Sequence, residues 1–250
     1  MTEIDTAVQA LVRARQARQA TAALSLPDAA AAYAVQDGVA RALGWFDERL
    51  PPYWKSGGAS RDAVLTHAPL PAQGVWASPA DARGWPLHRR GIEAEIALRL
   101  AQDVDAARAA TLDASAAAAL IDAMCVSIEI VDSRWLEGLA APALAKLADL
   151  QSHGALVLGA WTAFAARDWR AQSVRVQIGT QPPVERRGSH AMGDPTFVLP
   201  AWLRHATRRG GHVAEGTVVT TGTWVGILDA TAGDLVTAEF AGVGHASVQL

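Results

Sequence analysis

The strongest constraint in this chain is a pair of strand-like patterns that place glutamates among branched aliphatic residues. Residues 92–100 alternate, so their isoleucines and leucines share one face of an extended strand. Glu93 and Glu95 share the other face, roughly 6.5 to 7 Å apart along the strand. Neighbouring carboxylates repel one another, so a cation would stabilise this face of the strand.

Residues 126–132 form the second pattern, in which Glu129 stands among valines and isoleucines. A carboxylate in a buried strand needs a partner, a proton or a metal, because removing its charge from water is costly. Carboxylate ligands with positions left open for water suit Mg²⁺ or Mn²⁺. The patterns therefore predict a divalent metal on Glu93, Glu95 and Glu129.

Two other interpretations of the glutamates stay open from the residues alone. A Glu-x-Glu pair is common on half-exposed strands that bind no metal. An ion pair with Arg99 or Arg134 would also satisfy Glu129.

Lys55 is the second feature that points to a site, because the chain has only one other lysine, Lys146. It precedes Gly57 and Gly58, which allow backbone amides to approach an anionic ligand while the ammonium holds it. An exposed loop lysine is the alternative. His153, in Ser152-His153-Gly154, suits an acid or base, and a structural histidine explains it equally simply.

Composition excludes several classes of protein. The formal net charge is -3, so no basic field exists to hold nucleic acid. Cys125 is the single cysteine, which rules out a disulfide within the chain and a Cys/His zinc site. No apolar stretch reaches the roughly 18 residues of a membrane span. Residues 1–5 are polar, unlike a secretory signal, and we expect a soluble cytoplasmic protein.

The order of predicted elements indicates an α+β fold with a mixed sheet. We expect helices over residues 2–24 and 28–43, then a loop region rich in Pro and Gly from residue 50. Further helices are expected over 114–123 and 195–209. The remaining predicted strands cover residues 155–158, 173–178, 217–221, 235–240 and 246–250. This order divides the chain into a helical extension, 1–50, and a main domain, 51–250.

Several segments together resemble the fumarylacetoacetate hydrolase superfamily, in its branch of 2-oxopent-4-enoate hydratases and 4-oxalocrotonate decarboxylases. The strand motifs Gly91-Ile92-Glu93-Ala94-Glu95-Ile96-Ala97 and Ile128-Glu129-Ile130-Val131-Asp132-Ser133-Arg134 carry most of the resemblance. Weaker matches are Tyr33-Ala34-Val35-Gln36, residues 55–60, Gly193-Asp194-Pro195 and residues 216–222.

The resemblance implies a mixed β-roll, or partly open barrel, with N-terminal helices packed on it, in a homo-oligomer. It implies Mg²⁺ or Mn²⁺ on the three glutamates and Lys55 facing the 2-oxo acid end of a small substrate. We expect Lys55, Ser152 and His153 to be the catalytic residues. The expected substrate-binding residues are Lys55, Gly57, Gly58, Ser60 and Ser189.

The activity that the resemblance implies is that of a metal-dependent lyase. We expect hydration of a 2-hydroxy-2,4-dienoate to a 4-hydroxy-2-oxo acid through a metal-bound enolate, in the catabolism of aromatic or related compounds. A 2-oxo-acid decarboxylase and an acylpyruvate C–C hydrolase use the same enolate, and a non-catalytic 2-oxo acid binding or partner subunit is a further alternative.

The chain also departs from the branch around the expected site. Ser56, Gly58 and Ala59 replace the usual isoleucine, leucine and threonine of the lysine loop. Ala72 stands where an aspartate is usual, and Asp149-Leu150-Gln151-Ser152 replaces Asp-Asn-Ala-Ser. The metal ligands are kept while polar residues around them change, which favours an altered substrate.

Overall fold

A long antiparallel pair of strands organises the fold. The computed structural model describes residues 2–46 and 50–250, and within them β5 (Gly91–Leu100) pairs with β6 (Ile121–Val131) along its whole length. Glu93 lies directly opposite Glu129 in this register. Because side chains alternate across a strand, the aliphatic residues of β5 enter the core while its glutamates face the other way.

Nine strands form the larger sheet, in the order β2-β1-β11-β5-β6-β7-β3, with β12 pairing with β5 and β8 with β6. The sheet is mixed, since β1 runs parallel to β11 and β3 parallel to β7. The other strands of this sheet are β1 (Tyr53–Gly57), β2 (Thr66–Pro69), β3 (Val75–Ala77), β7 (His153–Leu158), β8 (Thr162–Ala163), β11 (Val218–Thr220) and β12 (Leu228–Asp229).

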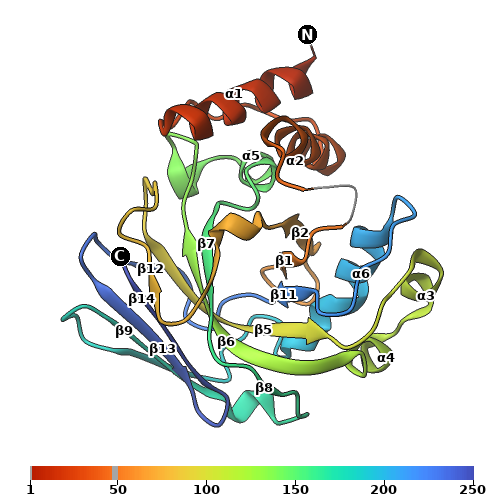
Figure 1. Cartoon of the computed structure of the whole chain (residues 1–250), viewed down its shortest axis with the longest axis vertical. Helices are drawn as coiled ribbons and strands as arrows, with labels where there is room; N and C mark the ends of the chain where they lie inside the picture. The colour runs from red at the N-terminus through yellow and green to blue at the C-terminus, as the bar shows by residue number, and fades with distance from the viewer. Residues whose placement is uncertain (1, 47–49) are drawn as a thin grey trace.

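A second sheet of five strands packs behind the first, in the order β10-β9-β13-β14-β4. Its strands are β4 (Ala80–Asp81), β9 (Ser173–Ile178), β10 (Val184–Arg187), β13 (Leu235–Phe240) and β14 (Gly244–Gln249). Strands β13 and β14 lie against β6. The main core fills the space between the two sheets, and the large sheet curls away from it (Figure 1).

Helices close the ends of the curled sheet. The first group is α1 (Glu3–Ala17), α2 (Ala29–Leu43) and α5 (Ala143–Ala148), which share a hydrophobic cluster with the buried Trp135. The second group lies beside β5 and β11 (Figure 1) and consists of α3 (Ala106–Thr111), α4 (Ala114–Ala118) and α6 (Leu199–Thr207). Short 3₁₀ turns η1 (Ala72–Gly74), η2 (Gly138–Ala140), η3 (Trp169–Ala171) and η4 (Pro195–Val198) join the elements.

The sequence predicts the helix that follows Asp28 well. Asp28 accepts a hydrogen bond from the backbone of Ala31 and caps α2, and Gly44 ends it in the left-handed conformation that glycine adopts without strain. Along this helix Val35 and Val39 are buried, as their helical spacing predicts.

The two sheets and the helices that pack on them confirm the predicted fold, a mixed α+β roll with N-terminal helices.

Two predicted helices are wrong at their ends. The first was expected to reach residue 24 but ends at Ala17, where Arg18 turns left-handed. The chain then runs extended, and Thr21 bridges to Trp135. The helix expected over 114–123 ends at Ala118, and β6 begins at Ile121, because pairing with β5 outweighs the helical preference of the alanines. Among the described helices, none has the length and apolar character to cross a membrane.

A buried ion-pair network joins the N-terminal helices to the sheet. Asp149, just after α5, accepts hydrogen bonds from Arg15 of α1 at 2.8 Å and from Arg134 at 2.8 Å. It also accepts from the backbone N–H of Arg134 at 2.9 Å. The carboxylate is almost fully buried, so these bonds replace the water that it gives up.

The division of the chain into a helical extension, 1–50, and a main domain, 51–250, stays a prediction.

We expect Asp149→Ala to lower the free energy of unfolding by about 3 to 5 kcal/mol, because it removes the main partner of the buried Arg134 charge and leaves it only the Asp132 carboxylate, at 3.3 Å. Urea unfolding followed by circular dichroism measures the change. Asp81→Ala is the matched control, since Asp81 pairs with Arg83 on the exposed surface and its loss is expected to change stability little. Equal effects of the two variants would contradict this assignment.

Candidate metal centre and active site

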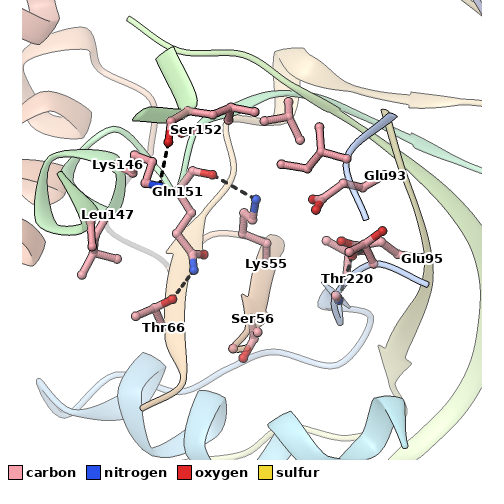
Figure 2. Close-up of a pocket in the computed structure, with 18 of the residues that line it drawn as sticks. Lys55, Ser56, Thr66, Glu93, Glu95, Lys146, Leu147, Gln151, Ser152 and Thr220 are labelled. Atoms are coloured by element: carbon pink, nitrogen blue, oxygen red, sulfur yellow. Dashed lines mark hydrogen bonds between the residues drawn. The ribbon is translucent and has the colours of Figure 1, made fainter. Parts of the chain in front are cut away.

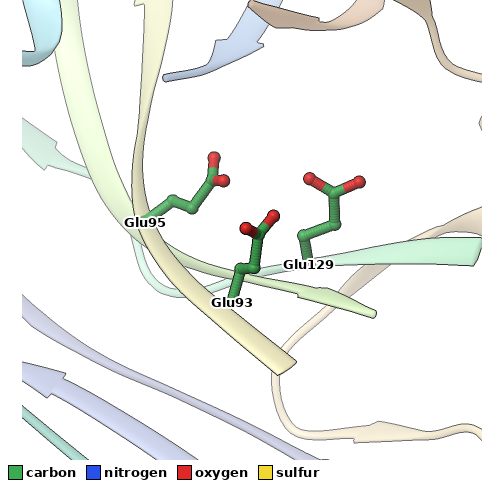
Figure 3. A group of neighbouring side chains, drawn as sticks. All are labelled: Glu93, Glu95 and Glu129. Atoms are coloured by element: carbon green, nitrogen blue, oxygen red, sulfur yellow. The ribbon is translucent and has the colours of Figure 1, made fainter. Parts of the chain in front are cut away.

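Three carboxylates meet on the concave side of the β5–β6 pair. Glu93, Glu95 and Glu129 each offer an oxygen, and these oxygens all lie within 4.8 Å of one another. Figure 3 shows the three side chains extending to the same side of the two strands, with their carboxylates near one another. Such a set of hard oxygen donors fits Mg²⁺ or Mn²⁺.

Glu129 is the most deeply buried of the three, and two titratable side chains donate to it. Its Oε1 accepts a hydrogen bond from the Lys55 ammonium at 2.5 Å and one from Nδ1 of His153 at 3.0 Å. The proton belongs on Nδ1 because an ionised carboxylate only accepts. Oε2 is buried without a partner among the described residues. A bound cation would satisfy that oxygen.

Glu95 is oriented from strand β11. Its Oε2 accepts from the Thr220 hydroxyl and from the backbone N–H of Gly222 at 3.0 Å. The Thr220 hydroxyl also lies 3.0 Å from Ser127 Oγ on β6. Gly222 has φ near 106°, a conformation that glycine tolerates best. The chain therefore supplies hydrogen bonds that hold Glu95 toward the other two carboxylates.

Charge balance in this cluster favours a divalent ion. Burial raises the pKa of Glu95 to about 7, and the charge of Glu129 adds to the effect. Burial, then Glu129 and Glu95, hold the pKa of Glu93 well above its usual range. Burial also acts on Glu129, but the charge of Lys55 and the bond from His153 outweigh it, and the pKa of Glu129 is lowered.

Lys55 remains a cation in this setting. Burial alone would lower the pKa of its ammonium, but the glutamates, Glu129 above all, outweigh burial and raise it. Burial lowers the pKa of His153, which keeps that ring neutral. When all three carboxylates are ionised, the single ammonium leaves two negative charges uncompensated, and a divalent cation would neutralise them.

The carboxylates open into a cavity of about 620 Å³. Glu93 and Glu95 line one side, and Lys55, Gly57 and Gly58 of β1 and its following loop line the middle. The remaining side chains along the cavity are mostly apolar and include Val64, Val131, Leu139, Leu144, Leu147 and Ile227. Its size and composition are those of a small-molecule site.

A strained loop reaches into this cavity from the end of α5. Leu150, Gln151 and Ser152 all have positive φ, between 52° and 60°, which costs non-glycine residues free energy. The loop places the Gln151 carbonyl 3.3 Å from the Lys55 ammonium, and the Gln151 amide donates to the Thr66 hydroxyl (Figure 2). The buried Asp149 network holds the start of this loop in place.

The structure brings most of the predicted site residues together. Lys55, Gly57, Gly58 and Ser152 line the cavity with Glu93 and Glu95. His153 lies behind Glu129, is fully buried and does not line the cavity, so its contact is to a carboxylate and not to a substrate. The alternative ion pairs for Glu129 are not formed, because Arg99 pairs with Asp122 and Arg134 with Asp149.

Two expected substrate-binding residues lie elsewhere. Ser60 and Ser189 are not among the residues that line the cavity. The Ser189 hydroxyl donates to the backbone carbonyl of Trp224 at 2.5 Å, so its hydrogen bond is already used.

Sequence reasoning missed several residues that the fold brings to the site. They are Thr66, Lys146, Gln151 and Thr220, together with the backbone N–H of Gly222. Lys146 carried one signal, its rarity as a residue type. The others come from strands and loops whose pairing partners are distant in the sequence.

Comparison with known proteins decides the family. The family model described as fumarylacetoacetate (FAA) hydrolase C-terminal matches residues 60–250. The chain belongs to the fumarylacetoacetate hydrolase family. A comparison with curated proteins by sequence found no match. The resemblance inferred from the two strand motifs is thereby confirmed.

Solved structures of the family share the fold over different lengths. The 4-oxalocrotonate decarboxylase from Pseudomonas putida G7, complexed with calcium and acetate, is 19% identical with a TM-score of 0.82, over 100% of this chain and 98% of that one. The structure of the same enzyme complexed with magnesium and adipate is 18% identical with a TM-score of 0.81, over 100% of this chain and 98% of that one.

The 2-hydroxyhepta-2,4-diene-1,7-dioate isomerase from Mycobacterium marinum is 14% identical, with a TM-score of 0.56, over 80% of this chain and 75% of that one. The decarboxylase fold therefore includes counterparts of the N-terminal helices, because it covers this whole chain. At sequence identities this low, the likeness establishes a shared fold only.

We expect Mg²⁺ to raise the melting temperature more at about pH 8 than at about pH 5.5. The raised pKa of Glu95, about 7 against an ordinary 4.5, means that the metal-free fold loses stability as pH rises through this range. A bound cation offsets the burial of these charges and their repulsion, which together cause the loss, and at low pH it must first displace protons. Thermal melts with and without MgCl₂ measure the difference, and equal shifts at both pH values would contradict it.

We expect Thr220→Val to weaken Mg²⁺ binding by roughly 10- to 100-fold, because Glu95 loses the hydroxyl that orients it. Thr221→Val is the matched control. Its hydroxyl is also buried but donates to the backbone carbonyl of Ile96 at 2.8 Å. Calorimetric titration with MgCl₂ compares the variants, and an equal loss of affinity in both would show that Thr220 has no particular role.

Proposed function

We propose that the chain is a metal-dependent lyase that acts on an unsaturated 2-oxo acid, or on its 2-hydroxydienoate tautomer. The observation that carries this proposal is the meeting of three carboxylates with a buried lysine, of which Glu93, Glu95 and Lys55 line a single cavity. Glu93, Glu95 and Glu129 would hold Mg²⁺ or Mn²⁺. When bound, the ion would supply a Lewis acid for the substrate's carboxylate and C2 oxygen.

Lys55 would hold the negative charge of the substrate. Its raised pKa keeps the ammonium protonated, so it serves as a donor and not as a base. One of its hydrogen bonds goes to Glu129 and one to the Gln151 carbonyl. The third donor of the ammonium is available to an anionic group in the cavity. As negative charge develops on the C2 oxygen, this buried cation would stabilise it.

His153 would act through Glu129. Its Nδ1–H donates to the carboxylate and keeps it ionised and oriented. Ser152 lines the cavity and, with the Gln151 backbone, forms the part of the wall next to Lys55. These residues position the charged groups, and the cavity beyond them is lined mostly by aliphatic side chains that exclude water.

Two reactions of the same electron sink fit this site. Hydration of a 2-hydroxy-2,4-dienoate is the reaction expected from the sequence, and it needs a water placed at the distal carbon. Decarboxylation of an unsaturated 2-oxo dioic acid is the second candidate, and the aliphatic wall supports it because loss of CO₂ needs no ordered water. The full-length likeness to a 4-oxalocrotonate decarboxylase agrees with this candidate.

The proposal extends to the setting of the enzyme. We infer a homo-oligomer in the cytoplasm that takes part in the breakdown of aromatic or related compounds. Acylpyruvate C–C hydrolysis uses the same enolate and is a further candidate reaction. If the protein is not an enzyme, the alternative is a non-catalytic subunit that binds a 2-oxo acid.

Parallel assays with 2-hydroxypenta-2,4-dienoate and 2-hydroxymuconate, each with MgCl₂, test the proposal. We expect loss of dienol absorbance with at least one of them, and release of CO₂ marks decarboxylation. Glu93→Gln is expected to lower the rate by more than about 100-fold, since it removes a ligand charge. Glu185→Gln, an exposed glutamate on β10, is the control. Mg²⁺-dependent binding of oxalate without turnover of any 2-oxo acid would support the binding subunit.

A further inference from the structure

The second lysine of the chain lies in the same cavity as the first. Lys146 is on α5, a helix of the N-terminal helical layer, and it lines the cavity together with Lys55. Figure 2 shows Lys146 and Leu147 on one side of the cavity, Glu93 and Glu95 on the opposite side, and Lys55 between them. Both lysines of a lysine-poor chain therefore face one cavity.

The charge of Lys146 has no acidic partner within residues 2–46 and 50–250. Among the described residues its ammonium makes no ion pair, and its hydrogen bond goes to the backbone carbonyl of Leu139 at 3.0 Å. That carbonyl uses one of the three donors of the ammonium and fixes its position. The remaining donors are free to bind an acceptor in the cavity.

The surroundings of Lys146 make this charge significant. Leu139, Ala143, Leu144 and Leu147, which are near it in the sequence, line the same cavity, and Figure 2 shows Gln151 and Ser152 beside it, neither of which carries a negative charge. A half-buried cation among aliphatic groups interacts more strongly with an anion than an exposed lysine does, because less water screens the pair. Lys55 by contrast is already paired with Glu129.

We propose that Lys146 binds a second carboxylate at the end of the cavity away from the glutamates, so that the substrate is a 2-oxo dioic acid. This inference rests on the proposed function, which places the 2-oxo acid end of the substrate at the glutamates and Lys55. The aliphatic side chains between the two ends then cover the carbon chain of the substrate. Lys146 is a specificity residue in this arrangement, because it touches the carboxylate that a monoacid lacks.

Two six-carbon ligands that differ only at their far end test the inference. 2-Oxoadipate carries a second carboxylate, and 2-oxohexanoate ends in a methyl group. Calorimetric titration of the Mg²⁺-loaded protein is expected to show that 2-oxoadipate binds about tenfold more tightly or better, the size of one charge-assisted contact.

Lys146→Met is expected to abolish this preference while the affinity for 2-oxohexanoate stays within about twofold. Lys146→Arg is expected to keep most of the preference, because the charge is retained. Arg204→Met is the matched control, since Arg204 is an exposed cation on α6 that also donates to a backbone carbonyl, that of Leu112 at 3.4 Å. It is expected to bind both ligands as the unaltered protein does.

The outcomes separate this inference from the function on which it rests. Equal Mg²⁺-dependent binding of the two ligands, or a preference that survives in Lys146→Met, would overturn the role of Lys146 and leave the proposed function standing. Failure of both ligands to bind in the presence of Mg²⁺ would overturn the proposed function, and the dioic acid with it.

Discussion

Repulsion among three carboxylates, held close together in the interior of the protein, is the interaction on which the rest of the structure depends. The β5–β6 register places Glu93 directly opposite Glu129, and Glu95 lies one pleat along the same face. Each contact around them reduces the cost of that arrangement. Lys55 and His153 act on Glu129, while Thr220 and Gly222 act on Glu95. A divalent cation would complete the balance.

The loop that follows α5 shows how the fold supports this cluster. Three consecutive non-glycine residues, 150–152, adopt positive φ. Such strain persists only where the surroundings hold it, and here the buried Asp149 ties the loop to Arg15 and Arg134. The N-terminal helices thus contribute to the site through this ion-pair network, and Ala29 at the start of α2 also lines the cavity. They also supply α5 with the partners that place Lys146 at the far end of the cavity.

Much of the site could be predicted because its signals are local. Alternation along a strand assigns Glu93 and Glu95 to one face, and an isolated Glu129 among aliphatic residues identifies the third ligand. The errors arose where distant pairing outweighs local preference. The alanines after residue 118 favour a helix. Strand β6 nevertheless begins at Ile121, because pairing along the whole of β5 outweighs that local preference. The predicted substrate-binding role of Ser189 stays a prediction, and in the fold its hydroxyl donates to the backbone carbonyl of Trp224.

By itself the sequence determined the kind of chemistry, since residue type and a period of two are enough to put three carboxylates on strand faces and to make Lys55 a rare cation. It also determined the family, through motifs that survive at low overall identity. Only the tertiary structure decided what surrounds those groups. Lys146, Gln151 and Thr220 reach the cavity from α5, a strained loop and β11, which are far apart in the chain. Their positions depend on strand order and helix packing, and no local pattern encodes these.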